Sequence, residues 1–146
     1  MATLFGWVAT LAAGLFGGAA LYVSLVEHPA RLSCGASAAI HEFRPSYRRG
    51  TFLQAPLAIV GALAALGRWA TDGSSVWLLG GLALGALVPF TLVVILPTNK
   101  RLLSDALEPA SAEAQALLAR WSRLHAVRTV VSLGVFAAFV ALTARR

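Results

Sequence analysis

Four long stretches of the chain contain no Asp, Glu, Lys or Arg, and they limit the folds open to it more than any other feature. These uncharged stretches are residues 1–26, 51–67, 73–99 and 129–144. A helix that crosses the hydrocarbon core of a bilayer needs about 20 mostly apolar residues. Charged residues make up 12% of the chain, about half of their usual share in soluble domains. The sequence therefore predicts one integral membrane domain over residues 1–146, an all-α four-helix bundle with up-down-up-down topology.

The expected membrane spans are residues 4–26, 48–68, 76–97 and 124–144. The second and fourth uncharged stretches are shorter than a span, and counting about 20 residues back from their ends reaches Arg48 and His125. Pro45 suits the first turn of a helix, so the second helix should begin near Pro45 and kink at Pro56. Residues 31–43, which precede it, are predicted to form a short amphipathic helix on the membrane surface.

Two local signals mark the ends of the later helices. The run Asp72-Gly73-Ser74-Ser75 is typical of a tight turn between the second and third helices. Ser111 is a suitable N-cap, so the fourth helix is predicted to start there and to reach Ala144.

Basic residues are shared unequally between the two ends of these spans. Nine lie at one end (Arg31, Arg44, Arg48, Arg49, Lys100, Arg101, Arg120, Arg123, Arg128) and three at the other (Arg68, Arg145, Arg146). Lys and Arg accumulate in cytoplasmic loops, so residues 27–47 and 98–123 are predicted to be cytoplasmic and both termini outside. The net charge of +6 is explained by this flanking pattern and by lipid head groups, and nothing indicates a nucleic-acid partner.

Small residues spaced four apart occur in the first and third spans, at Gly14 and Gly18 and at Gly81 and Gly85. This spacing lets membrane helices approach closely. Packing inside one bundle is the favoured interpretation, and a homo-oligomer formed through either pair is the alternative.

The chemically versatile residues collect at one end of the spans. His28 ends the first span and Asn99 ends the third, while Trp121, His125 and Arg128 follow one stripe of the fourth helix at i, i+4 and i+7. Polar side chains in lipid turn toward the bundle interior, so this stripe should face inward. Asn99 is either a helix C-terminal cap or a donor aimed into a pocket.

A charged group inside a span is costly without a partner. Glu27 is the acidic residue beside a span at the same end and at the depth of Arg128. We therefore expect a contact between Glu27 and Arg128.

Three histidines, His28, His41 and His125, raise the possibility of a shared iron or copper ion, because imidazole ligates both metals. Their spacing matches no compact metal-binding motif, so separate interfacial hydrogen bonds are the favoured interpretation. Tyr47 and Trp121 are typical of the interfacial aromatic belt. Both are also candidates, with Arg48, for contacts to a flat aromatic ligand.

Four stretches of the chain resemble the anthrone-oxygenase-like family of small four-span membrane proteins. They are Glu27-His28-Pro29-Ala30-Arg31, Arg44-Pro45-Ser46-Tyr47-Arg48-Arg49-Gly50, Leu96-Pro97-Thr98-Asn99-Lys100-Arg101-Leu102 and Trp121-Ser122-Arg123-Leu124-His125-Ala126-Val127-Arg128-Thr129. The resemblance covers essentially the whole chain. Because most members are bacterial, it implies a bacterial inner membrane.

The resemblance implies a site made from His28, Asn99, Trp121, His125 and Arg128. Characterised fungal members are associated with oxidising an anthrone to an anthraquinone, so the expected activity is that of an oxygenase or oxidase acting on a lipid-soluble aromatic. His125 or His28 would remove an activated C–H proton, and Arg128 and Asn99 would stabilise the resulting oxyanion. The alternative is a non-catalytic membrane protein, such as an assembly subunit, a small-molecule sensor or a permease-like component.

Overall fold

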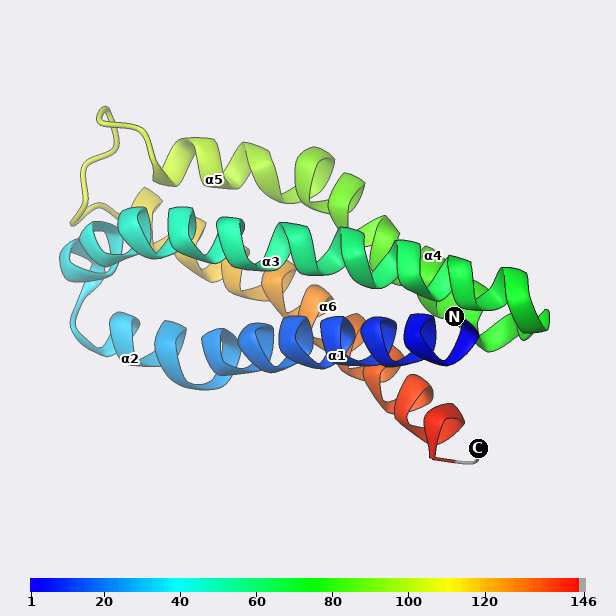
Figure 1. The fold of residues 1–146 in the computed structure, drawn as a ribbon. Helices are drawn as coiled ribbons and strands as arrows, with labels where there is room; N and C mark the ends of the chain where they lie inside the picture. The colour runs from blue at the N-terminus through cyan, green and yellow to red at the C-terminus, as the bar shows by residue number, and fades with distance from the viewer. Residues whose placement is uncertain (145–146) are drawn as a thin grey trace.

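The structure, a computed structural model, describes residues 1–144 and is helical throughout apart from short connections (Figure 1). Arg145 and Arg146, counted above in the charge bias, lie outside the described residues. The elements are α1 (Ala2–Tyr22), η1 (Val23–Glu27), α2 (His28–Ser33), α3 (Ala36–Asp72), α4 (Ser75–Phe90), η2 (Thr91–Ile95), α5 (Leu96–Leu102) and α6 (Ala112–Thr143). The two η elements are five-residue π-helical segments.

Four helical stretches are long and apolar enough to cross a membrane: Ala2–Ser33, Ala36–Asp72, Ser75–Leu102 and Ala112–Thr143. The prediction of an all-α integral membrane protein is thereby confirmed. Successive stretches run in alternating directions, with the N-terminus and the end of α6 at the same end of the molecule (Figure 1). α1 packs against α3 and α6, and α4 packs against the same two helices.

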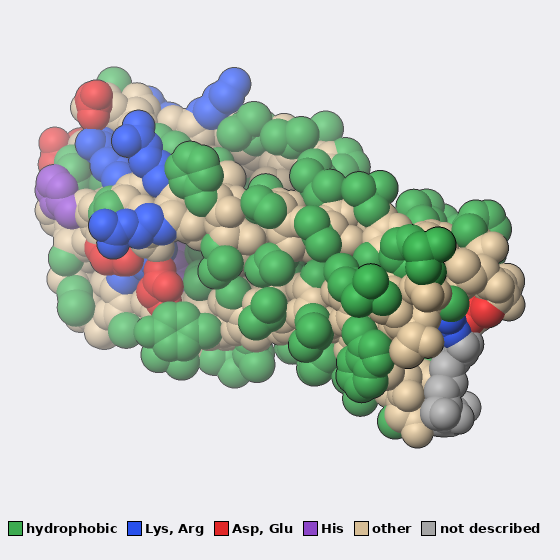
Figure 2. Space-filling model, in the orientation of Figure 1, with side chains coloured by type: hydrophobic (Ala, Val, Ile, Leu, Met, Phe, Trp, Pro, Cys, Tyr) green, Lys and Arg blue, Asp and Glu red, His purple; other side chains and the backbone are tan. Residues whose placement is uncertain are grey.

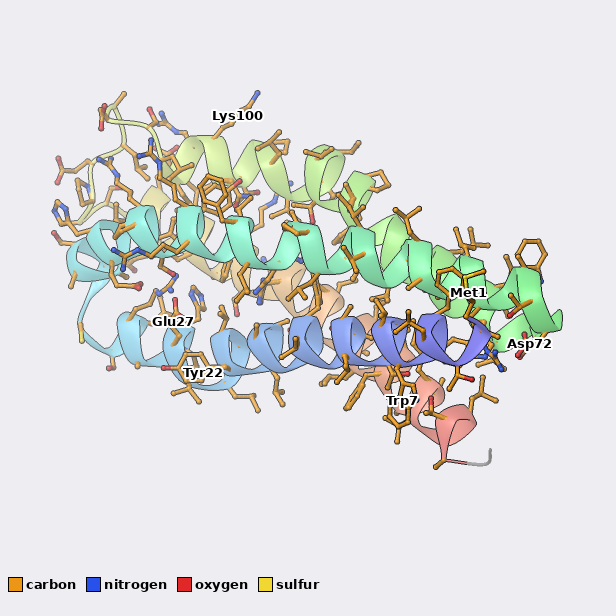
Figure 3. The ribbon with its side chains drawn as sticks, in the orientation of Figure 1. Met1, Trp7, Tyr22, Glu27, Asp72 and Lys100 are labelled. Atoms are coloured by element: carbon orange, nitrogen blue, oxygen red, sulfur yellow. The ribbon has the colours of Figure 1, made fainter. Side chains whose placement is uncertain are left out.

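The outer surface of these helices is apolar, as contact with lipid requires. Leu11, Leu63, Leu79 and Val130 are between 61% and 72% exposed, although they lie near the middle of their helices. Hydrophobic side chains cover the flank of the molecule, whereas charged side chains gather mainly at one end (Figure 2). Glu27 and Lys100 lie at this charged end and Asp72 lies at the opposite one (Figure 3).

The second helix differs from its prediction. It begins at Ala36, not near Pro45, and continues through Pro45 and Pro56 to Asp72. The separate surface helix predicted over residues 31–43 is also wrong, since this stretch is divided between α2 and the first turns of α3. The physical reason is burial: Ile40 and Phe43 are at most 1% exposed and pack in a hydrophobic cluster with α6.

Both helix-end signals in the sequence are confirmed. Gly73 adopts a left-handed conformation with φ of 68°, and the backbone N–H of Ser74 donates to Oδ1 of Asp72 at 3.0 Å. The Ser111 hydroxyl accepts a hydrogen bond from the backbone N–H of Ala114 at 3.1 Å and so caps α6.

Most glycines of the two predicted pairs pack against other helices of the same chain. A Cβ atom added at Gly14 would lie 2.7 Å from the ring of Phe136 in α6, and one added at Gly81 would lie 3.1 Å from α3. Gly85 also faces α3, at 3.5 Å, whereas Gly18 has nothing within 4 Å. Close packing within one chain therefore accounts for three of the four glycines, and association of copies stays a prediction with Gly18 as its open position.

Each π-helical segment ends two residues before a proline, Pro29 after η1 and Pro97 after η2. Proline has no N–H, and its ring clashes with the carbonyl four residues earlier in a regular α-helix. Those carbonyls belong to Leu25 and Val93, the central residues of the two segments. The wider turn moves these carbonyls away from the proline rings, and such segments are frequent at functional sites.

Candidate functional site

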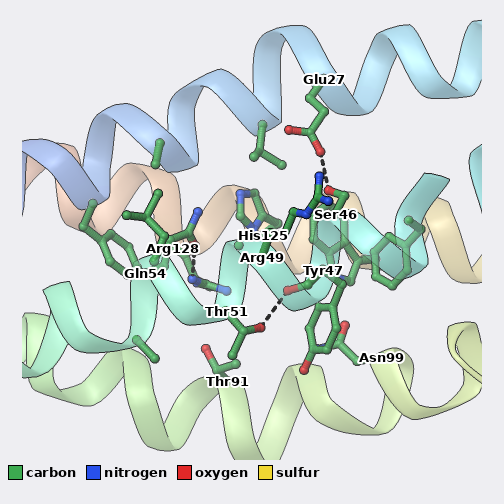
Figure 4. Close-up of a pocket in the computed structure, with 18 of the residues that line it drawn as sticks. Glu27, Ser46, Tyr47, Arg49, Thr51, Gln54, Thr91, Asn99, His125 and Arg128 are labelled. Atoms are coloured by element: carbon green, nitrogen blue, oxygen red, sulfur yellow. Dashed lines mark hydrogen bonds between the residues drawn. The ribbon is translucent and has the colours of Figure 1, made fainter.

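A cavity of about 750 Å³ lies beside the first half of α3, and its walls are completed by α1, η1, α2, α4, η2, α5 and α6 (Figure 4). Its volume falls in the range of about 300–1,000 Å³ that is typical of small-molecule sites. Five aromatic side chains line it, those of Phe16, Tyr22, Phe43, Tyr47 and Trp121. Its polar lining includes Glu27, Arg31, Glu42, Ser46, Arg49, Thr51, Gln54, Thr91, Asn99, His125 and Arg128.

His125 lies in the cavity wall and is 3% exposed. Its Nε2 is 3.3 Å from the backbone oxygen of Ala20. Because a carbonyl oxygen only accepts, Nε2 carries the proton in this hydrogen bond. In the neutral imidazole Nδ1 then bears the lone pair, and it has no hydrogen-bond partner among the described residues. Trp121 stacks on the imidazole, with ring centroids 4.7 Å apart and planes 12° from parallel.

Arg128 lies next to His125 in the wall but does not contact Glu27, so that prediction is wrong. The guanidinium donates to Oε1 of Gln54 from α3, and its Cζ lies 5.3 Å from the centre of the Phe16 ring. Gln54 is 5% exposed. A neutral amide and an aromatic face thus hold this cation of the cavity lining.

Glu27 is directed elsewhere because Arg31 follows it by one turn. Arg31 pairs with Glu27 and lies 2.5 Å from Glu42 through Nε. Ser46 donates to Glu27 and accepts from Arg31 at 3.0 Å. These four residues tie η1 and α2 to α3 at the charged end of the cavity.

Asn99 is not a helix cap, since α5 continues to Leu102. It is 1% exposed, lines the cavity, and its Oδ1 has no hydrogen-bond partner among the described residues. Tyr47 also lines the cavity and stacks on Phe43 at 5.8 Å. Of the two alternatives for Asn99, the structure favours the side chain aimed into a pocket.

His28 occupies a different position from the other site candidates. It is 2% exposed, but it lies behind Trp121 and not in the cavity lining. Its ring centroid is 5.0 Å from that of Trp121. Trp121 therefore contacts both imidazoles, and His28 is placed to fix the ring that stacks on His125.

Arg48 and His41 are exposed and lie outside the cavity lining. Within residues 1–144, no group of three or more His, Cys, Asp or Glu side chains is placed to hold a metal ion. The donors that could ligate iron or copper are not assembled around His28, His41 and His125, so no step below is assigned to a metal.

Sequence reasoning missed several lining residues, above all Gln54 and Thr91. Both are polar residues within uncharged stretches, and this was the signal that could have found them. Arg31 was read only as a flanking charge, although it is 6% exposed and lines the cavity.

These features define an integral membrane protein with an aromatic-lined cavity that holds an unprotonated imidazole nitrogen and a cation. A family model described as anthrone oxygenase matches residues 43–138. The chain is also 30% identical over 135 residues to the anthrone oxygenase tpcL of Aspergillus fumigatus, covering 86% of this chain and 84% of that protein. The chain therefore belongs to the anthrone oxygenase family. No solved structure matches it.

Proposed function

We propose that the protein is a membrane oxygenase that oxidises a flat, lipid-soluble aromatic resembling an anthrone. The observation that carries the proposal is the pairing of His125 Nδ1, a free base, with the Arg128 guanidinium one turn later in an aromatic cavity. Membership of the anthrone oxygenase family supports the reaction class, and the relative's name supports the choice of substrate.

The proposed reaction begins with removal of one proton from the methylene carbon of the substrate by His125 Nδ1. The electron pair moves onto the ring carbonyl oxygen, and Arg128 and the amide group of Asn99 stabilise the enolate that forms. The methylene carbon then bonds to dioxygen, and the peroxide takes the proton back from His125. Loss of water breaks the O–O bond and the second C–H bond and leaves a new carbonyl. One oxygen atom stays in the product and the other leaves as water.

The aromatic walls supply binding and orientation. Phe43 meets Trp121 edge-on at 5.2 Å, and Trp121 is stacked on His125, so the rings brace one another. Stacking of a flat substrate on such walls holds its reacting carbon near one base, which converts a bimolecular step into an effectively unimolecular one. Tyr47, on the α3 side, would complete this binding surface.

We place the site near the cytoplasmic face of a bacterial inner membrane. The charged end beside the cavity carries most of the basic residues of the chain, as the positive-inside rule requires of that face. Accessibility of the single cysteine, Cys34, which is exposed at this end, tests the orientation. A membrane-impermeant thiol reagent should label Cys34 only after the membrane is opened, and labelling of intact cells would contradict it.

The activity is tested by purified protein in lipid vesicles supplied with anthrone, with anthraquinone formation and oxygen uptake measured against empty vesicles. His125→Ala should lower turnover roughly 100-fold or more, because a positioned general base contributes about 10²–10⁴-fold. His41→Ala is the matched control and should be unchanged, since His41 lies outside the cavity. Full turnover in both His125→Ala and Arg128→Ala would overturn the proposal, and tight binding without any turnover would favour a ligand sensor.

A further inference from the structure

Arg31, Arg68 and Arg128 have different partners. The Arg31 and Arg68 side chains are 3% and 5% exposed, and each pairs with carboxylates, Arg68 with Asp72 at 3.1 Å. Arg128 has no Asp or Glu oxygen within 4.0 Å among residues 1–144. Its partners are the neutral oxygen of Gln54 and the face of Phe16.

An uncompensated cation within a membrane span is expensive, and arginines there normally face a partner or a functional cavity. Arg128 faces the cavity, and its Nε has no hydrogen-bond partner among the described residues. Gln54 orients the guanidinium without neutralising it, so the positive charge is directed at the cavity.

From this we infer that the cavity binds its aromatic ligand as an oxyanion, with Arg128 as the counter-ion. The inference rests on the proposed function for the flat aromatic part of the ligand, and it adds the charge of the bound form. The ligand class is an aromatic with an acidic phenolic hydroxyl, whose O–H proton passes to solvent on binding, and the methylene C–H proton is left for His125 to remove. Gln54 keeps its own N–H donors for the same oxygen.

The other charged groups around the cavity do not change this conclusion. Glu27 and Glu42 both pair with Arg31 at the charged end, and the excess negative charge is offset by Arg49, which is exposed in the same lining. His125 donates from Nε2 to a carbonyl and in its neutral form adds no charge. The other charged groups of the lining therefore sum to zero and leave the positive charge of Arg128, with Tyr22 and Tyr47 as further titratable groups.

The test uses a coloured probe, 2-hydroxyanthraquinone, whose absorbance distinguishes the phenol from the phenolate and which lacks the methylene group that is oxidised. The probe is titrated with base in vesicles with and without the protein. An opposite charge within hydrogen-bonding distance lowers an acid's ionisation midpoint by about 1–3 pH units. The wild-type protein should lower the midpoint of the bound probe by about one unit or more. 2-Methoxyanthraquinone, which cannot ionise, should bind about tenfold more weakly.

Arg128→Gln should return the midpoint to its value in protein-free vesicles, and Arg128→Lys, which keeps the charge, should retain the shift. Arg48→Gln is the matched control, an exposed arginine of α3 outside the cavity lining, and should leave the shift in place. Equal midpoints for wild type and protein-free vesicles, or equal binding of the two probes, would overturn the inference. The probe comparison on wild type decides the matter even if Arg128→Gln does not fold.

The result is separable from the proposed function. A lowered midpoint in a protein that never oxidises anthrone would leave the oxyanion site in place and overturn the oxygenase. Oxidation of anthrone by a protein that binds the probe as a neutral phenol would support the oxygenase and overturn the oxyanion site.

Discussion

The two ends of this molecule are built from the same four helical stretches but differ in how closely the helices approach. At the packed end, defined by Gly61, Gly80, Gly81, Trp77 and Phe139, small residues allow contact, and the Trp77 and Phe139 rings are 4.4 Å apart. At the cavity end, which holds η1, η2 and the residues of the candidate site, about 750 Å³ is left open. The packed end has a cavity of only about 210 Å³. Residue size and the two proline-linked π segments thus decide where the interior is filled.

Each end contains a buried arginine paired with a carboxylate, Arg31 or Arg68. Replacing either arginine with glutamine gives the largest expected effect on stability. Arg31→Gln and Arg68→Gln should each lower the free energy of unfolding by roughly 3 kcal/mol, because carboxylates lose a buried ion-pair partner. Only Arg31→Gln should also weaken binding of an aromatic probe, since Arg31 lines the large cavity. Thermal unfolding in detergent and probe titration measure the two effects. Equal loss of binding in Arg68→Gln would show that the ends are not independent.

A smaller effect is expected from filling the helix interface. A Cβ added at Gly80 would lie 2.4 Å from the Phe139 ring, so Gly80→Ala should cost about 1–3 kcal/mol of unfolding free energy. Gly18→Ala is the matched control, because nothing lies within 4 Å of that position. Its stability should be unchanged or raised by up to about 1 kcal/mol through better helix propensity. A loss at Gly18 equal to that at Gly80 in vesicles would instead indicate contact with a second copy.

The smallest change in stability, and the sharpest test of the cavity end, comes from the prolines. Pro97→Ala supplies an N–H to the carbonyl of Val93, which favours an α-helical turn in place of η2 and alters stability by less than about 1 kcal/mol. Probe affinity should nevertheless fall, because Thr91 and Asn99 line the cavity from either side of this turn. Pro89→Ala, at an exposed position outside the lining, is the control. Unchanged affinity in Pro97→Ala would show that η2 does not shape the cavity.

Sequence reasoning found the fold because lipid leaves a chain few choices. Uncharged stretches of sufficient length predict helices, and the Ser111 cap and the Gly73 turn fixed two helix ends correctly. The same reasoning misplaced the start of α3, because Pro45 is tolerated in this helix and the burial of Ile40 and Phe43 depends on α6.

Within the site, His125, Arg128, Trp121, Asn99 and Tyr47 all reach the cavity as their end-of-span positions suggested. Their partners could not be predicted, because partner choice depends on the rotation of each helix and not on depth alone. Glu27 pairs at the charged end with Arg31 and Ser46, and Gln54 is the residue that α3 turns toward Arg128.

The π-helical segments also bear on how such a chain tolerates insertions and deletions. A π turn holds one more residue than the α turn it replaces, and one residue corresponds to about 100° of rotation in an α-helix. Because the wider turn absorbs that residue, deleting a single residue from η1 would restore a regular helix and keep His28 and Arg31 close to their present phase with α1, whereas a deletion in a regular α turn would rotate them. The two π segments are therefore the places in these helices where a change of one residue in length disturbs the orientation of α2 and α5 least.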